Sequence, residues 1–322
     1  IKGGVARVAV RGGVFSSAGS SEAVSGVSQT IEQGKTYGSV GESGSGKTTL
    51  ARAVAGLHHA SEGSILYRGQ ELRDLPEAQF RKLRREIVMM FQDPIGSLSP
   101  RLSVKSLITD PFRIQGMKDR DLDAEARRLL AMVGLPPEFA ARYPYQISGG
   151  QARRVGVARA LALDPKLLIA DEPTAGLDVS IQGEMLNLLA RLQDELGLAI
   201  MIITHNLNVV RHITDRVGIM YLGKLVEEGE TDTVFSAPRH PYTLALLAAN
   251  PEPDPDAQLM RIELQGEPPS ILNRPTGCEF HTRCPFAQAR CSTDVPSWQV
   301  AGPAAHRCHF PASWEQGKVG PA

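Results

Sequence analysis

Residues 41–48, Gly-Glu-Ser-Gly-Ser-Gly-Lys-Thr, are the feature that most limits what this chain can fold into. They match Gly-x-x-x-x-Gly-Lys-Thr, after a short β-type run at 36–40 and before a helix-like segment at 48–57. A phosphate-binding loop requires this strand–loop–helix context. The glycines let successive backbone N–H groups surround phosphate oxygens, and the helix adds its positive N-terminal end. The pattern therefore predicts a phosphate site in an α/β fold.

The side chains of this loop fit the binding of a nucleoside triphosphate together with Mg²⁺. We expect Lys47 to reach the β- and γ-phosphates and the Thr48 hydroxyl to ligate Mg²⁺. An ordinary glycine-rich turn between a strand and a helix is the alternative, which the complete pattern disfavours. The residues predicted to contact the nucleotide are Gly41, Ser43, Gly44, Ser45, Gly46, Lys47, Thr48 and Thr49.

A second candidate feature is the apolar run Leu167–Ala170, which ends in the acid pair Asp171 and Glu172. In P-loop nucleoside triphosphatases an acid at such a strand end assists Mg²⁺. A second acid there is placed to orient or deprotonate the attacking water. Taken alone, the pair could equally cap the turn that Pro173 begins. The phosphate loop upstream favours the chemical role.

A third feature is Ile147-Ser-Gly-Gly-Gln151, which precedes a predicted helix at 152–163. A Ser-Gly-Gly run at a helix start presents free N–H groups to an anion. A simple helix cap with a flexible turn is the alternative interpretation. Because the chain already has one phosphate loop, this second element is expected to complete the site of a neighbouring subunit.

The remaining pattern predicts a mainly parallel sheet covered by helices, with a helical insertion at 94–147. Residues 5–10 alternate like an edge strand, and residues 121–133 have helical periodicity. The strands predicted further along are 65–67, 87–90, 167–170, 198–203 and 217–221. The helices predicted there are 181–196 and 209–214.

Composition excludes several classes of protein. The chain has 322 residues, enough for about two domains. Lys plus Arg and Asp plus Glu are both 35, which disfavours a protein whose main task is to grip nucleic acid phosphates. No apolar run approaches the ~18 residues of a membrane span, so any role at a membrane requires docking on a spanning partner. The start at Ile1, without a signal segment, leaves three interpretations: a fragment, a processed chain, or the second half of a longer polypeptide.

Together these motifs resemble those of an ABC-type ATPase subunit over about residues 5–250. Their order and spacing carry the resemblance: residues 41–48, Phe91-Gln-Asp-Pro94, residues 147–151, Asp171-Glu172, Gly176-Leu-Asp178 and Thr204-His205. The nearer resemblance is to the ATP-binding subunits of oligopeptide and dipeptide importers. It is carried by residues 91–101, His240-Pro-Tyr-Thr243 and Gly266-Glu-Pro-Pro-Ser270.

The resemblance implies a RecA-like P-loop ATPase core with an antiparallel β edge region and an inserted helical subdomain. The implied domains are an ABC ATPase domain at 1–235, with the helical subdomain at about 94–150, and an importer-type C-terminal extension at 236–322. The implied activity is ATP hydrolysis that powers import of di- or oligopeptides. Three alternatives remain: importers for nickel or other non-peptide cargo, ABC ATPases of DNA repair or translation, and a regulatory or iron–sulfur scaffold protein.

The resemblance also implies roles for individual residues. Glu172 resembles the catalytic base and Asp171 a Mg²⁺ ligand. Gln92 resembles the sensor of γ-phosphate and Mg²⁺ that couples to the membrane subunit, and His205 the switch histidine at the γ-phosphate. Phe15 is the candidate for stacking on adenine. Contacts to ATP held by a second subunit are implied for Ser148, Gly149, Gly150 and Gln151, and a dimer-interface contact for Asp178.

The partners implied are a second ABC ATPase domain, separate or fused in the same chain, and two transmembrane permease subunits. The permeases are expected to dock on an apolar surface around residues 92–115. An extracytoplasmic substrate-binding protein would take part indirectly, and no nucleic acid is expected. The implied location is peripheral, at the cytoplasmic face of the inner membrane.

All four cysteines follow residue 277, with the spacing C-x5-C-x6-C-x16-C. They are Cys278, Cys284, Cys291 and Cys308. Four thiolates can hold Zn²⁺ or an iron–sulfur cluster, but zinc sites usually contain C-x2-4-C pairs and the ferredoxin spacings differ. The spacing alone therefore identifies no metal. Some importer ATPases of this family have a four-Cys tail that resembles a [4Fe–4S] site, so the resemblance implies that cluster, with zinc or no metal as alternatives.

Overall fold

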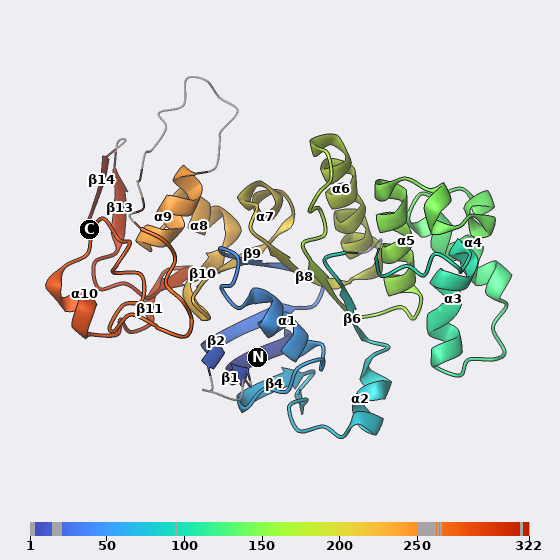
Figure 1. The fold of residues 1–322 in the computed structure, drawn as a ribbon, viewed down its shortest axis with the longest axis horizontal. Helices are drawn as coiled ribbons and strands as arrows, with labels where there is room; N and C mark the ends of the chain where they lie inside the picture. The colour runs from blue at the N-terminus through green and yellow to red at the C-terminus, as the bar shows by residue number, and fades with distance from the viewer. Residues whose placement is uncertain are drawn as a thin grey trace. The chain divides into compact units, whose positions relative to one another are not determined.

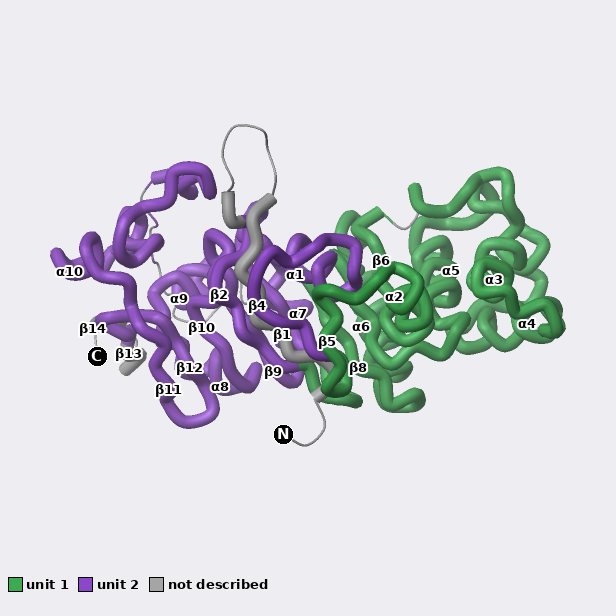
Figure 2. The backbone as a smooth tube through the Cα atoms, turned by 90° about the horizontal axis from the view of Figure 1, so that it is seen from below, with its two compact units in different colours: residues 1–5, 31–36, 67–203 green, residues 6–30, 37–66, 204–322 purple. Residues whose placement is uncertain are grey.

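The computed structural model of the chain describes residues 4–14, 21–93, 96–249, 262, 264, 266–315 and 318–321. Phe15, the predicted adenine-stacking residue, lies outside these residues. The chain forms two compact units, each assembled from separate segments (Figure 2). Unit 1 consists of residues 1–5, 31–36 and 67–203, and unit 2 of residues 6–30, 37–66 and 204–322.

Unit 1 is built on three parallel strands, β6 (Ile87–Met90), β7 (Leu167–Asp171) and β8 (Ala199–Thr204), with β7 in the middle. Every residue of β7 and β8 is buried. Continuous apolar runs are typical of parallel strands covered on both faces. These three strands confirm the predicted runs 87–90, 167–170 and 198–203.

Helices make up most of the remainder of unit 1. Among them α3, α4 and α5 pack on one another and form the helical cluster labelled in Figure 1. Asp121 begins α4 by accepting hydrogen bonds from the N–H groups of Asp123 and Ala124. Helices are thus present within the predicted insertion. The further elements of unit 1 are β5 (Gln70–Glu71), α2 (Glu77–Leu83), α3 (Val104–Ile114), α4 (Leu122–Met132), η1 (Pro137–Ala141), η2 (Pro144–Gln146), α5 (Gly149–Leu161) and α6 (Val179–Leu196).

Unit 2 contains a mixed sheet in which β3 (Thr36–Val40) pairs in parallel with β9 (Arg216–Tyr221). Antiparallel pairing then joins β9 to β10 (Lys224–Glu230), β10 to β12 (Ala304–His306) and β12 to β11 (Gln299–Ala301). A strand from beyond residue 300 therefore extends the sheet that contains β3. A further sheet holds β2 (Ser21–Glu32), β1 (Gly4–Val14) and β4 (Glu62–Tyr67), in that order.

The core of unit 2 unites distant parts of the sequence. Val40 and Ile219, from β3 and β9, belong to the same buried cluster as Tyr221, Tyr242 and Phe280. The remaining elements of unit 2 are α1 (Lys47–Val54), α7 (Leu207–Ile213), α8 (Thr231–Ser236), α9 (Pro241–Ala248), α10 (Ala289–Thr293), β13 (Ala312–Glu315) and β14 (Lys318–Pro321). Among the described residues, no helix combines the length and the apolar character that a membrane span requires.

Candidate nucleotide-binding site

The predicted phosphate loop connects β3 to α1 in unit 2, as its sequence context requires. Gly41 and Gly46 have φ angles of +156° and +93°. A Cβ on Gly46 would lie within 3.0 Å of the carbonyl oxygen of Ala23 and 3.2 Å from Cα of Gly223. Glycine is therefore needed here both for the backbone conformation and for the close approach of two other chain segments.

Lys47 directs its ammonium group into the loop itself. Nζ donates to the carbonyl oxygens of Gly41 at 2.7 Å and Glu42 at 2.8 Å, and lies 3.1 Å from the hydroxyl of Ser45. The side chain is buried. Ser43 and Gly44 at the loop tip are exposed, and Thr48 and Thr49 at the start of α1 are half-buried. The loop thus combines a fixed positive charge with a helix N-terminus, which suits a polyphosphate.

The acid pair lies at the carboxyl end of β7 in unit 1. Asp171 is buried, and Glu172 has a φ of +49° while its N–H donates to Ile203 at 2.8 Å. A positive φ is uncommon for a residue other than glycine and concentrates at functional sites. Gln92 follows the neighbouring parallel strand β6 and is exposed. The structure therefore brings Gln92, Asp171 and Glu172 to the same edge of the unit 1 strands.

Ser148 caps α5 through a reciprocal pair of hydrogen bonds with Gln151. The Ser148 hydroxyl accepts from the Gln151 N–H at 3.3 Å, and the Gln151 side chain accepts from the Ser148 N–H at 3.0 Å. The capping alternative is therefore present in this chain. Ser148 is exposed, and Gly149 and Gly150 begin the helix. This location is compatible with binding an anion from another molecule.

The last two predicted site residues also lie at element ends. Asp178 is the N-cap residue of α6 and is exposed. His205 directly follows β8 and is exposed, and the next residue, Asn206, caps α7. Both are therefore accessible at positions where a strand or loop passes into a helix.

Arg153 is a site residue that the sequence analysis missed. This buried side chain of α5 donates to the carbonyl oxygens of Pro173, at 2.7 Å, and Ala175. Burial lowers the pKa of its guanidinium. Arg153 therefore ties the helix that follows Ser148 to the segment that follows Glu172. Its only sequence signal is a charged residue within an otherwise buried helix face.

The four cysteines surround one small pocket in unit 2, with His240, Phe280 and His281 among its other walls. Burial, with a smaller contribution from the neighbouring thiols, raises the pKa of Cys284 to about 11 and that of Cys308 to about 12. Among the residues that the structure describes, no group of three or more His, Cys, Asp or Glu side chains is arranged to hold a metal ion. The four thiols line one pocket, but the described residues support neither the expected [4Fe–4S] cluster nor a zinc site.

The chain matches two family models. The model "ABC transporter" matches residues 24–175, and "Oligopeptide/dipeptide transporter, C-terminal region" matches residues 226–291. Among solved structures, the dimeric MJ0796 cassette, a bacterial ABC transporter cassette, is similar with a TM-score of 0.63 and 29% identity, covering 70% of this chain and 98% of that one. The cassette cbiO1 from Clostridium perfringens has a TM-score of 0.66 and 30% identity, covering 73% and 92%. The predicted RecA-like ABC ATPase fold is thereby confirmed.

Curated relatives resemble the chain over most of its length. The oligopeptide transport ATP-binding protein AppF of Bacillus subtilis is 46% identical over 307 residues, covering 94% of this chain and 93% of that protein. OppF of Salmonella typhimurium is 47% identical (85% and 84% covered), and the di/tripeptide transport ATP-binding protein DppF of Pseudomonas aeruginosa is 44% identical (92% and 92%). This chain therefore belongs to the family of ABC-type ATPases that form the ATP-binding subunits of oligopeptide and dipeptide transporters.

Proposed function

We propose that the chain binds MgATP at residues 41–48 and hydrolyses it to drive import of di- or oligopeptides. One observation carries this proposal: Lys47 is buried within a glycine loop at the start of α1, where three oxygens of the loop hold its ammonium. Membership of the transporter family supports peptide cargo over the non-transport alternatives. The relatives whose names specify oligopeptides or di/tripeptides match this chain along most of its length.

The chemical roles follow from position. Lys47 neutralises the β- and γ-phosphates, and Thr48 and Asp171 hold Mg²⁺. Glu172 orients and deprotonates the attacking water, with Gln92 and His205 at the γ-phosphate. The unusual φ of Glu172 supports its role, since it redirects the chain directly after β7. Phe15 stays the candidate for adenine stacking.

A second ABC ATPase domain completes each site. Residues 148–151 bind the nucleotide held by that partner, and Asp178 contacts it across the interface. Support comes from the exposure of Ser148 and Asp178, and from the dimeric form of the similar MJ0796 cassette. The chain divides into an ABC ATPase domain at 1–235, with a helical subdomain at about 94–150, and an extension at 236–322.

Two permease subunits dock on a groove in unit 1, and an extracytoplasmic binding protein delivers the cargo to them. The groove is lined by residues of β6, α3 and α5, among them Ile114 at the end of α3, and by Phe91, which directly follows β6. Their side chains are 47% and 54% exposed, which is unusual for large apolar groups and fits a covered docking face. The subunit thus acts at the cytoplasmic face of the inner membrane.

The cysteine pocket holds a [4Fe–4S] cluster with Cys278, Cys284, Cys291 and Cys308 as its ligands. Four thiols around one pocket supply the donors that such a cluster uses. Bound there, the cluster would cross-link the segment 278–308.

Replacement of the proposed base tests the hydrolytic mechanism. Glu172→Gln keeps the size of the side chain but removes the proton acceptor, so ATP binding should persist while turnover falls by roughly 10²-fold or more. Glu184→Gln, an exposed glutamate of α6, is the matched control. Undiminished hydrolysis in Glu172→Gln would exclude this residue as the base. Unchanged ATP affinity in Lys47→Ala would exclude residues 41–48 as the phosphate site.

A further inference from the structure

Glu42, the second residue of the phosphate loop, is held at all of its polar groups within unit 2. Its N–H donates to the hydroxyl of Tyr242 at 2.9 Å. Its carboxylate accepts two hydrogen bonds from Arg283, from Nη1 at 2.9 Å and from Nη2 at 3.2 Å. Its carbonyl oxygen accepts from Lys47 at 2.8 Å. One residue therefore connects the segment that contains the cysteines to the phosphate-binding lysine.

Arg283 and the Glu42 carboxylate form a bidentate ion pair. Two parallel hydrogen bonds join the planar guanidinium to the carboxylate, which sets both the distance and the orientation of Glu42. The Arg283 side chain is only 7% exposed and that of Glu42 is 28% exposed. Removing the arginine would leave a carboxylate with little solvent inside a loop that must receive a polyanion.

An aromatic cluster of Tyr221, Tyr242 and Phe280 fixes the other contact. The ring centroids of Tyr221 and Tyr242 are 4.8 Å apart, and that of Phe280 lies 5.3 Å from each of them. All three side chains are buried. The N–H of Arg283 donates to the carbonyl oxygen of Phe280 at 3.0 Å, so the same cluster also places the arginine.

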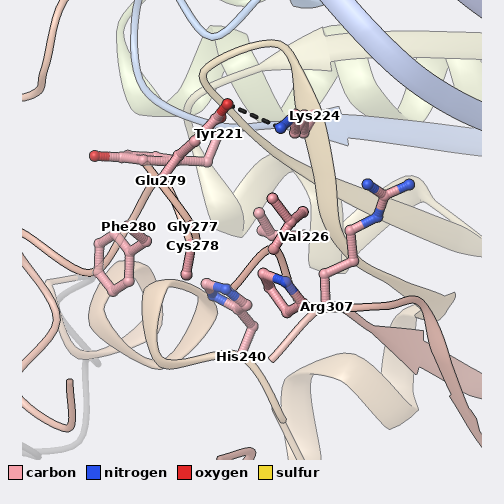
Figure 3. A pocket seen from close by; sticks show the side chains of 11 residues that line it. Tyr221, Lys224, Val226, His240, Gly277, Cys278, Glu279, Phe280 and Arg307 are labelled. Atoms are coloured by element: carbon pink, nitrogen blue, oxygen red, sulfur yellow. Dashed lines mark ion pairs between the residues drawn. The ribbon is translucent and has the colours of Figure 1, made fainter. Parts of the chain in front are cut away.

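A second support of the loop is the turn at residues 222–224, which the extension holds in turn. The N–H of Gly223 donates to the Ser45 carbonyl at 2.9 Å. The turn that contains Gly223 is held by Arg274, which donates to the Leu222 carbonyl. Glu279 pairs with Arg274 at 3.0 Å and with Lys224 at 2.9 Å; Figure 3 shows the Lys224 pair beside Tyr221. The extension thus supports the phosphate loop directly at Glu42 and indirectly through the turn that contains Gly223.

We propose that Arg283 and Tyr242 are positioning residues that hold the phosphate loop in its ATP-binding form by acting through Glu42. The proposal rests on the proposed function of residues 41–48. Arg283 neutralises and orients the carboxylate, and Tyr242 fixes the N–H of the same residue. The Glu42 carbonyl, which receives Lys47, is then fixed from both sides. The C-terminal extension is thereby part of the nucleotide site.

Equilibrium binding of MgATP to the full chain, together with steady-state hydrolysis, tests this role. Arg283→Met should raise the dissociation constant of ATP about tenfold, equivalent to about 1.4 kcal/mol, and raise KM in proportion while kcat changes less than about twofold. Arg283→Lys keeps the positive charge but cannot form the two parallel hydrogen bonds. Its dissociation constant for ATP should therefore lie between those of the wild type and Arg283→Met. Tyr242→Phe should weaken binding several-fold, since the Glu42 N–H loses its acceptor.

The double variant Glu42→Gln with Arg283→Met identifies the route of the effect. Because Glu42→Gln and Arg283→Met break the same contact, their effects should not add, and the double variant should bind ATP about as weakly as Arg283→Met alone. Arg290→Met, an exposed arginine of the same segment, is the matched control and should bind like the wild type. Thermal unfolding of every variant is measured alongside.

Two results would overturn the proposal. The first is a loss of thermal stability in Arg283→Met, Arg283→Lys and Tyr242→Phe with ATP affinity unchanged, which would make these contacts structural only. The second is a double variant whose loss of binding free energy equals the sum of the losses in Glu42→Gln and Arg283→Met, because the effect of Arg283 would then bypass Glu42. The variant Lys47→Ala distinguishes both results from a wrong assignment of the phosphate site. If residues 41–48 did not bind ATP, Lys47→Ala would also bind ATP normally.

Discussion

Replacement of Gly46 by alanine tests how tightly the phosphate loop is packed on the chain behind it. Gly46 has a φ of +93°, and its Cβ would lie within 3.0 Å of the Ala23 carbonyl oxygen and 3.2 Å from Cα of Gly223. Gly44 has a similar φ of +80°, but a Cβ there would meet nothing within 4 Å. Comparing the two alanine variants separates the steric contact from the cost of the backbone conformation.

The structure gives a magnitude for each variant. An alanine in left-handed backbone costs roughly 1–2 kcal/mol, which both variants incur. Overpacking adds roughly 1–3 kcal/mol in Gly46→Ala only. Gly223 does not yield easily, since Ser25 donates to its carbonyl oxygen at 2.8 Å and its own N–H donates to the Ser45 carbonyl at 2.9 Å. We expect the free energy of unfolding to fall by roughly 2–5 kcal/mol in Gly46→Ala and roughly 1–2 kcal/mol in Gly44→Ala.

Urea unfolding without nucleotide, followed by circular dichroism, measures this difference. The same samples are then titrated with MgATP, and Gly46→Ala should lose affinity at least about tenfold more than Gly44→Ala, since Lys47 directly follows the displaced residue. Equal unfolding free energies for the two variants would refute the reasoning, because the steric contact would then be absent. Such a result would also remove Ala23 and Gly223 as the support of the loop.

Three further predictions concern other parts of the molecule. Protein purified without oxygen should contain about four iron atoms per chain and absorb broadly near 400 nm. Cys308→Ser should lose both the iron and the absorption. Stoichiometric zinc without iron would contradict the cluster. Ile114→Glu should abolish co-purification with the permeases and leave the ATP affinity of the isolated subunit unchanged, whereas Leu196→Glu, on α6, should affect neither. Burial raises the pKa of Glu227 to about 7 from 4.5. The contribution of Glu227 to folding stability is therefore complete below about pH 4.5 and is lost as the pH rises through 7. Between these pH values the unfolding free energy of the wild type should fall by about 3 kcal/mol more than that of Glu227→Gln. Parallel pH profiles of the two proteins would contradict this.

Local sequence was sufficient to predict most elements and the motif residues. The runs at 36–40 and 87–90 are β3 and β6 with the same bounds, and the helix expected at 121–133 is α4 at Leu122–Met132. Each of these elements is specified by residues within a few positions of it, namely by a hydrophobic period, by a capping aspartate or by a terminating glycine. The phosphate loop is equally local, because eight consecutive residues specify both its glycine conformations and its lysine.

Contacts between distant positions could not be predicted in this way. Glu42 occupies a variable position of the loop pattern, and its partner Arg283 follows 241 positions later. Nothing in either neighbourhood specifies the pair, which exists because Phe280 packs on Tyr221 and Tyr242. The Arg153 contacts are of the same kind, since a helix pattern does not reveal which carbonyl groups a buried guanidinium will meet. The cysteine spacing likewise left the metal open, because ligand geometry depends on how the chain between the thiols folds.

The link through Glu42 changes how the C-terminal extension should be understood. Cys284 directly follows Arg283, and Phe280 lies two residues after Cys278, so the residues that place the phosphate loop are interleaved with the proposed cluster ligands. Cys278 and Cys284 also pack against the core that contains Val40, the last residue before the loop. A rearrangement of the thiols must therefore move either the arginine or the aromatic cluster. Because interiors are close-packed and yield little, that movement reaches Glu42 and, through its carbonyl oxygen, Lys47.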